Sequence, residues 1–136
     1  MRQIGERALW IGNAGSLQDA RRILQTGIEA VVELADCEPF ATLPRHLIRC
    51  RFPLSEGGEN PPAVLRLAAE TVAGLLRAEI PVLICCSAGL SRSVCMAAAG
   101  LVIAEGVSMK EAIAEIVDGH PADISPALFA ELKAVL

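Results

Sequence analysis

Residues 82–93 read VLICCSAGLSRS, an apolar run followed directly by small and polar residues. The apolar part is typical of a buried strand, and the periodicity of residues 92–104 is typical of a buried helix. Between the two, residues 87–91 form a short loop. Backbone N–H groups converge at the start of such a helix, where the positive end of the helix dipole stabilises an anion. The segment therefore predicts an anion-binding loop at a strand-to-helix junction.

Three residues of this segment carry chemistry. Cys86, at the end of the strand, places its thiol in the loop, where the same N–H groups stabilise a thiolate. Gly89 lets the backbone turn tightly or approach a ligand closely. Arg92 offers a planar fork of donors to two phosphate oxygens. Taken alone, Cys86 also fits a small buried apolar residue, but a cation at a helix start is unfavourable without an anionic partner, so the pair favours a phosphate site.

Outward from this loop, strands and helices alternate along the chain. Apolar runs predict strands at 8–11, 28–34, 47–54 and 81–85, and helical periodicity predicts helices at 16–25, 61–78, 92–104 and 108–118, with a last helix from Ser125. This alternation predicts an α/β fold with a central, mostly parallel sheet flanked by helices. A length of 136 residues suits one hydrophobic core, so we expect a single domain over residues 1–136.

The composition excludes several classes of protein. Hydrophobic residues make up 53% of the chain, which excludes a disordered chain. A net charge of −4 and an aromatic content of 3% argue against a nucleic-acid partner. The five cysteines form no Cys-x-x-Cys pair and are joined by two histidines, so we expect reduced thiols, no metal and no cofactor. No apolar stretch suits a membrane span, and we expect a cytoplasmic protein with no membrane partner.

The loop also matches a known signature. Cys86-x-x-Gly89-x-x-Arg92-Ser93 resembles the Cys-(x)5-Arg motif of protein tyrosine phosphatases, and Ser91-Arg92-Ser93 resembles the form common among dual-specificity phosphatases. Segments 9–13, 27–34, 52–54 and 124–132 resemble, in order, other stretches of that family. The resemblance covers nearly the whole chain and implies a protein tyrosine phosphatase-like fold of the dual-specificity type.

The resemblance implies a role for each residue of the loop. Cys86 is the expected nucleophile, which forms a cysteinyl-phosphate that water then hydrolyses. Arg92 and the loop N–H groups are expected to hold phosphate or sulfate, and Ser93 is expected to hydrogen-bond the sulfur. The phosphate-binding set is Ser87, Ala88, Gly89, Leu90, Ser91 and Arg92. The implied substrate is a phosphoprotein, phosphorylated on tyrosine or on serine and threonine, or a small phosphomonoester.

The general acid is where the sequence departs from the family pattern. The family places an aspartate about 30 residues before the nucleophile to protonate the leaving oxygen. Residues 53–60 contain no aspartate, and Glu56 is the best match, with Glu59 second. Two other positions differ: Cys85 replaces the usual histidine before the nucleophile, and Ala127 replaces an asparagine of the last helix, which removes a polar group that could support the loop.

These departures keep two alternatives open. The first is a pseudo-phosphatase, a phosphate-binding module with weak or no turnover. The second is a rhodanese-like sulfurtransferase, whose active loop also holds a cysteine at a strand-helix junction. Trp10 and Phe129 lie in segments expected in the core, which leaves Phe52 and Phe40 as the aromatic residues near the site. We therefore expect a shallow or aliphatic substrate pocket.

Overall fold

A mostly parallel sheet forms the centre of the molecule. The structure is a computed structural model and describes residues 1–39 and 41–136. Within these residues the sheet has the order β1-β2-β5-β3-β4, in which β1 is antiparallel to β2 and all other neighbours are parallel. The strands are Arg2–Gln3 (β1), Leu9–Asn13 (β2), Ala30–Glu33 (β3), Ile48–Arg51 (β4) and Val82–Cys86 (β5).

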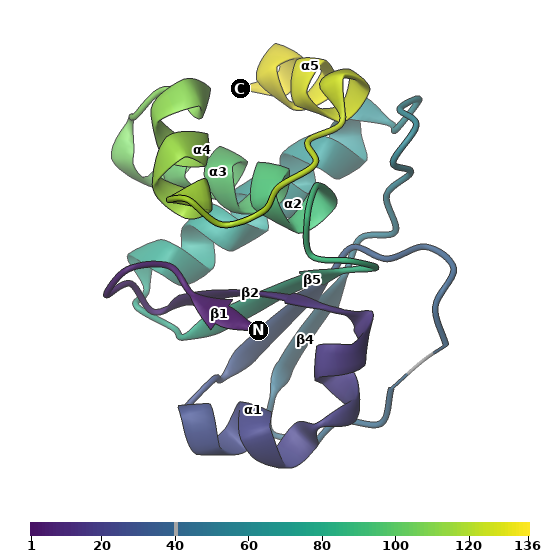
Figure 1. Ribbon diagram of the computed structural model, residues 1–136, viewed down its shortest axis with the longest axis vertical. Helices are drawn as coiled ribbons and strands as arrows, with labels where there is room; N and C mark the ends of the chain where they lie inside the picture. The colour runs from purple at the N-terminus through teal and green to yellow at the C-terminus, as the bar shows by residue number, and fades with distance from the viewer. Residues whose placement is uncertain (40) are drawn as a thin grey trace.

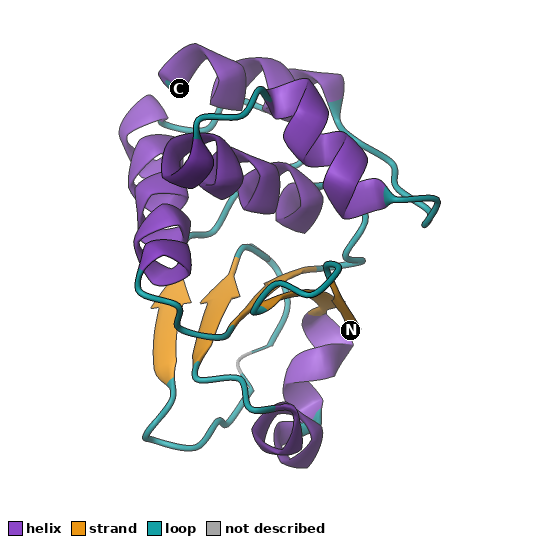
Figure 2. Cartoon of the chain, turned by 90° about the vertical axis from the view of Figure 1, so that its left-hand side faces the viewer, coloured by secondary structure: helices purple, strands orange, loops and turns teal. Residues whose placement is uncertain are grey.

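Helices cover both faces of the sheet (Figures 1 and 2). One face carries α1 and a short 3-10 helix, and the other carries α2, α3, α4 and α5. Their bounds are Ala14–Gln18 (the 3-10 helix, η1), Ala20–Thr26 (α1), Pro62–Arg77 (α2), Arg92–Glu105 (α3), Met109–Val117 (α4) and Pro126–Val135 (α5). The predicted α/β fold, with a mostly parallel sheet flanked by helices, is confirmed. Within the described parts of the chain, no helix is both long enough and apolar enough to cross a bilayer.

Two hydrophobic clusters lie on the two faces of the sheet. The larger one joins the sheet to α2–α5, and its members include Ile84, Cys86 and Met96. The smaller one joins the sheet to η1 and α1 and includes Leu17 and Ile23. Side chains on a strand alternate between the two faces, so β5, whose five residues are all buried, contributes to both clusters. The strand that ends in Cys86 is thus fixed from both sides.

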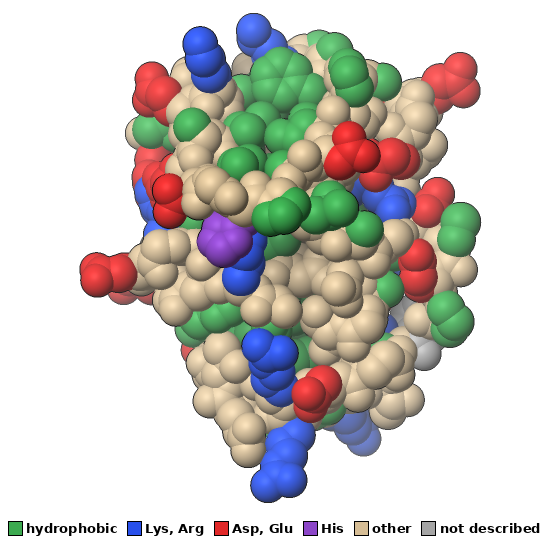
Figure 3. Space-filling view, viewed as in Figure 1, with side chains coloured by type: hydrophobic (Ala, Val, Ile, Leu, Met, Phe, Trp, Pro, Cys, Tyr) green, Lys and Arg blue, Asp and Glu red, His purple; other side chains and the backbone are tan. Residues whose placement is uncertain are grey.

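The space-filling view shows how the surface differs from this core. On the face drawn in Figure 3, hydrophobic side chains gather over the top of the molecule, around α4 and α5. Basic and acidic side chains on the same face are interspersed. Large fields of one sign are therefore absent from the face shown.

Three local features differ from the predictions. The helix expected at 16–25 is split, because η1 ends at Asp19, whose side chain accepts a hydrogen bond from Arg22 N at 3.1 Å and begins α1 there. Strand β1 was not predicted, since two residues give no periodicity. The last strand also extends one residue further than expected, to Cys86. Two other helices begin at the predicted serines. Ser108 accepts a hydrogen bond from Glu111 N, and Ser125 accepts one from Leu128 N.

The contact between α2 and α3 is close enough to predict the effect of one methyl group. A Cβ atom at Gly100 would lie 2.3 Å from Val72 Cγ1, whereas a Cβ atom at Gly74 would meet nothing within 4 Å. We expect Gly100→Ala to lower the free energy of unfolding by about 1–3 kcal/mol through overpacking. Gly74→Ala should raise it by about 0.5–1 kcal/mol through helix propensity. Denaturant titration of both variants measures the difference, and equal changes in the two would contradict this account.

Candidate active site

The sulfur of Cys86 lies at the end of the central strand, inside the loop that follows it. Cys86 is 2% exposed and pairs in register with Asn13 of the neighbouring strand β2. Its Sγ accepts a hydrogen bond from Gly89 N at 3.2 Å and lies 3.2 Å from Ser93 Oγ, at hydrogen-bond distance. An N–H group and a hydroxyl at these distances can stabilise negative charge on a sulfur.

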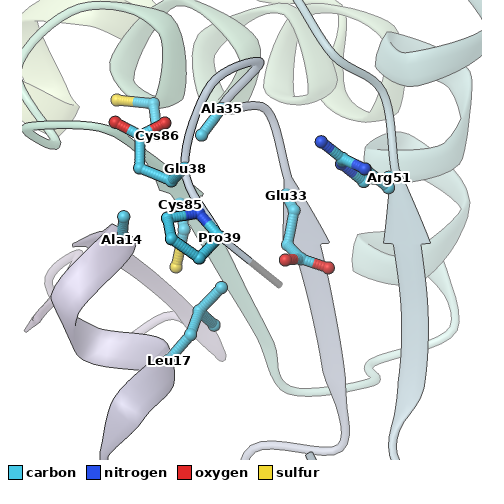
Figure 4. Close-up of a pocket in the computed structure, with 9 residues that line it drawn as sticks. All are labelled: Ala14, Leu17, Glu33, Ala35, Glu38, Pro39, Arg51, Cys85 and Cys86. Atoms are coloured by element: carbon cyan, nitrogen blue, oxygen red, sulfur yellow. The ribbon is translucent and has the colours of Figure 1, made fainter. Parts of the chain in front are cut away.

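The adjacent cysteine points away from the site. Figure 4 shows the sulfurs of Cys85 and Cys86 on opposite sides of strand β5, with that of Cys85 directed toward Leu17. Cys85 accordingly packs in the smaller cluster and Cys86 in the larger one. Burial raises the pKa of the Cys85 thiol to about 12, so this thiol stays protonated at neutral pH. Burial raises the pKa of Cys95 on α3 to about 12 as well.

The guanidinium of Arg92 turns back from the start of α3 into the loop. Its NH1 donates to Asp36 Oδ1 at 3.0 Å and to the carbonyl of Leu54 at 2.9 Å, and its NH2 donates to Ser87 Oγ at 2.5 Å. Its Nε lies 3.3 Å from a Glu56 oxygen but has no hydrogen-bond partner in the described chain, although Arg92 is 6% exposed. Both terminal nitrogens of the guanidinium are therefore held by the protein, and its Nε lies beside the carboxylate of Glu56, which lines the same pocket.

Asp36 is a site residue that the sequence analysis missed. Burial acts to raise the pKa of its carboxyl, but the hydrogen bond from Arg92 and further donors outweigh this, so the pKa lies below its ordinary value. Asp36 follows β3, and the carboxyl ends of neighbouring parallel strands meet at one edge of a sheet. A carboxylate two residues after the predicted end of this strand was the available signal, because β3 pairs with the strand that ends in Cys86.

The loop of residues 87–91 is packed tightly against strand β2. Gly89 has φ +74°, and a Cβ atom there would lie 2.8 Å from the carbonyl oxygen of Gly12. Glycine is therefore required at this position for both its backbone angles and its size. On the other side, Ser91 Oγ accepts from Ser125 N at 3.0 Å, and Asp123 N donates to the carbonyl of Leu90 at 3.0 Å. The loop is held from β2 and from the segment that precedes α5.

Of the two candidate acids, Glu56 lies at the pocket. Its side chain lines the cavity above the loop and faces Arg92, whereas Glu59 is exposed and does not line that cavity. The backbone carbonyl of Glu56 accepts from Ser125 Oγ at 2.8 Å. Glu56 is thus brought next to the predicted phosphate-binding residues, by a contact with α5 that the sequence did not reveal.

The pocket itself is open and aliphatic. It has a volume of about 290 Å³ and is lined by Glu56, Cys86, Ser87, Ala88, Leu90, Ser91, Arg92, Asp123, Ile124, Ser125 and Pro126. No aromatic side chain of the described residues lines it, and Phe52 packs against the core. Phe40, the other aromatic residue expected nearby, lies outside the described residues. Within residues 1–39 and 41–136, no group of three or more His, Cys, Asp or Glu side chains could hold a metal ion.

Solved structures share this fold over nearly the whole chain. Human DUSP28 matches with a TM-score of 0.86 and 20% identity, covering 99% of this chain and 94% of its own. A mouse putative dual specificity phosphatase complexed with zinc tungstate matches with a TM-score of 0.84 and 22% identity, covering 98% and 84%. PTPMT1 in complex with PI(5)P matches with a TM-score of 0.75 and 18% identity, covering 98% and 92%.

No protein-family model and no curated protein sequence matches the chain. The likeness in structure nevertheless covers 98–99% of the chain, from the sheet to the last helix. The chain therefore has the fold of the dual-specificity phosphatases.

Proposed function

We propose that the chain is a cysteine-dependent phosphatase that hydrolyses phosphomonoesters through a cysteinyl-phosphate. The observation that carries this proposal is the meeting, in one pocket, of the Cys86 sulfur and a buried arginine. A tetrahedral oxyanion fits such a site, because the loop N–H groups and the guanidinium can each donate to its oxygens. The neighbouring structure complexed with zinc tungstate supports an oxyanion as the ligand.

The first step transfers the phosphoryl group to sulfur. The Cys86 thiolate attacks phosphorus in line with the leaving oxygen, so that an S–P bond forms as the P–O bond breaks. Arg92 and the N–H groups of residues 87–92 hold the three equatorial oxygens. Glu56, in its protonated form, donates its proton to the leaving oxygen and becomes a carboxylate.

The second step returns the enzyme to its starting state. Water attacks phosphorus, and Glu56 accepts the proton that this water releases. The S–P bond breaks and inorganic phosphate is formed. The departing thiolate is stabilised by Gly89 N–H and by the hydroxyl of Ser93, both 3.2 Å from the sulfur. No group outside the chain and the water is needed for this cycle.

The shape of the pocket favours phosphomonoesters of more than one kind. Phosphotyrosine, phosphoserine and phosphothreonine side chains and small phosphomonoesters all present the same dianion. Because the described lining has Leu90, Ile124 and Pro126 but no aromatic ring, it offers no stacking partner for phosphotyrosine. We therefore place dual specificity, or a small phosphate ester, ahead of strict specificity for phosphotyrosine.

Replacing the proposed acid tests the mechanism. We expect Glu56→Gln to lower kcat on phenyl phosphate by about 100-fold and to remove the fall in rate on the alkaline side of the pH profile, because glutamine has no proton to donate. A pH-rate profile of the parent and the variant measures both effects. Glu59→Gln is the matched control in the same loop and should keep the parent profile. If Glu59→Gln loses the alkaline fall and Glu56→Gln keeps it, Glu59 is the acid.

A further inference from the structure

The loop that carries Glu56 is closed at its base by one buried side chain. Asn60 is 6% exposed, and its amide bonds both backbone groups of Ser55. The Oδ1 atom accepts from Ser55 N at 2.7 Å, and Nδ2 donates to the Ser55 carbonyl at 2.9 Å. This pairing joins the two ends of the segment 55–60 in the manner of a strand ladder, so the loop between them has few ways to open.

A glutamate of the last helix completes this arrangement. Glu131 Oε2 accepts from Asn60 N at 3.0 Å, and Glu131 Oε1 accepts from Asn60 Nδ2 at 3.0 Å. Both carboxylate oxygens thus receive hydrogen bonds from one residue, which fills the donor capacity of the Asn60 amide and backbone. We call this pair the Asn60–Glu131 clamp. It ties the loop to a helix more than 60 residues further along the chain.

The loop also fits closely against α5. Gly58 is buried with φ +96°, and a Cβ atom there would lie 3.2 Å from Ala127 Cβ and 3.6 Å from Glu131 Oε1. Ser125 Oγ, at the start of α5, donates to the carbonyl of Glu56 itself at 2.8 Å. Figure 1 shows α5 lying across the start of α2, which follows this loop directly. The small side chain at Ala127 is therefore matched to a loop that packs under the helix.

We infer that Asn60 and Glu131 are positioning residues that hold the Glu56 carboxyl at the phosphate pocket. This inference rests on the proposed phosphatase function and on Glu56 as the acid. Because the loop is tied at its base by the clamp and at Glu56 by Ser125, the acid is set in place before a substrate arrives. A proton donor displaced by about 1 Å can cost about 100-fold in rate, so loss of the clamp should act through the acid alone.

The test compares two substrates that differ in their need for a proton. Phenyl phosphate has a poor leaving group, whereas 2,4-dinitrophenyl phosphate releases a stable anion. We expect Glu131→Ala to lower kcat/KM, which covers only the steps up to formation of the cysteinyl-phosphate, by about 10–100-fold on phenyl phosphate and by less than about 3-fold on the dinitrophenyl ester. The affinity for tungstate should not change. In the Glu56→Gln background, Glu131→Ala should cause no further loss, because the acid that it positions is already absent.

Two further variants keep the test sharp. Glu131→Gln retains the size of the side chain but can accept only through one atom. We therefore expect its kcat/KM on phenyl phosphate to lie between those of the parent and Glu131→Ala. Lys133→Ala, an exposed position on the same helix, is the control and should match the parent. Equal losses of kcat/KM on both esters in Glu131→Ala, or a further loss when Glu131→Ala is added to Glu56→Gln, would overturn the inference. If Glu56→Gln itself shows no dependence on the leaving group, the acid assignment fails and the clamp has no acid to position.

Discussion

Cys86→Ser removes turnover of an aryl phosphate, lowering kcat by at least about 10⁴-fold, while the protein still binds tungstate. Serine keeps the size of the side chain and can accept from Gly89 N as the sulfur does, so the loop should keep its shape. The hydroxyl, however, is a far weaker nucleophile than a thiolate at neutral pH. Steady-state kinetics give the loss, and calorimetric titration with tungstate shows that the pocket remains.

A matched thiol variant separates loss of the nucleophile from loss of any cysteine. Cys37→Ser, at an exposed position, should keep the parent rate. A covalent phosphoryl group on Cys86, trapped by rapid acid quench and located by mass spectrometry, would support the first step directly. If Cys86→Ser keeps the activity, the proposed mechanism is wrong. If the parent binds tungstate but has no activity to lose, the chain is a phosphate-binding module, and a persulfide formed on Cys86 with thiosulfate would favour a sulfurtransferase.

The central part of the site could be predicted because it is local in sequence. Cys86, Gly89 and Arg92 lie within one strand-loop-helix segment, and the hydrogen bond from Gly89 N to the Cys86 sulfur forms inside that segment. The arginine was the informative residue, since a cation at the start of a helix needs an anionic partner. In the folded chain two carboxylates, Asp36 and Glu56, lie beside it. The protein itself therefore supplies part of the negative charge that this cation needs.

The supporting residues could not be predicted because only the fold brings them together. Asn60 and Glu131 are 71 positions apart and join through the packing of α5 against the loop before α2. The sequence indicated a loss of polar support for the loop of residues 87–91 at Ala127, but it did not show that Gly58 lies against Ala127 or that Glu131 hydrogen-bonds Asn60. Such pairings depend on tertiary structure, whereas periodicity reports only on single elements.

Arg92→Lys should lower kcat/KM on an aryl phosphate by about 10³-fold and weaken tungstate binding strongly. Removing one donor to developing charge typically costs about 10²–10³-fold, and here lysine removes a planar pair of donors while keeping the charge. A lysine ammonium also cannot bond Asp36, Leu54 and Ser87 with the geometry that the guanidinium has. The ammonium group of the lysine would lie among these acceptors, away from the position that Nε occupies beside Glu56 at the pocket.

The size of the loss in kcat/KM, and the substrates on which it occurs, decide whether the Arg92 guanidinium binds the phosphate. If the guanidinium binds the phosphate, Arg92→Lys should lower kcat/KM on phenyl and 2,4-dinitrophenyl phosphate alike, because both esters carry the same phosphoryl group. Glu56→Gln, in contrast, should lower kcat/KM mainly on phenyl phosphate. Arg66→Lys, at an exposed ion pair with Glu70 on α2, is the matched control and should keep the parent rate. A variant Arg92→Lys with parent tungstate affinity would show that the loop N–H groups hold the anion alone, and the assignment of Arg92 would then be wrong.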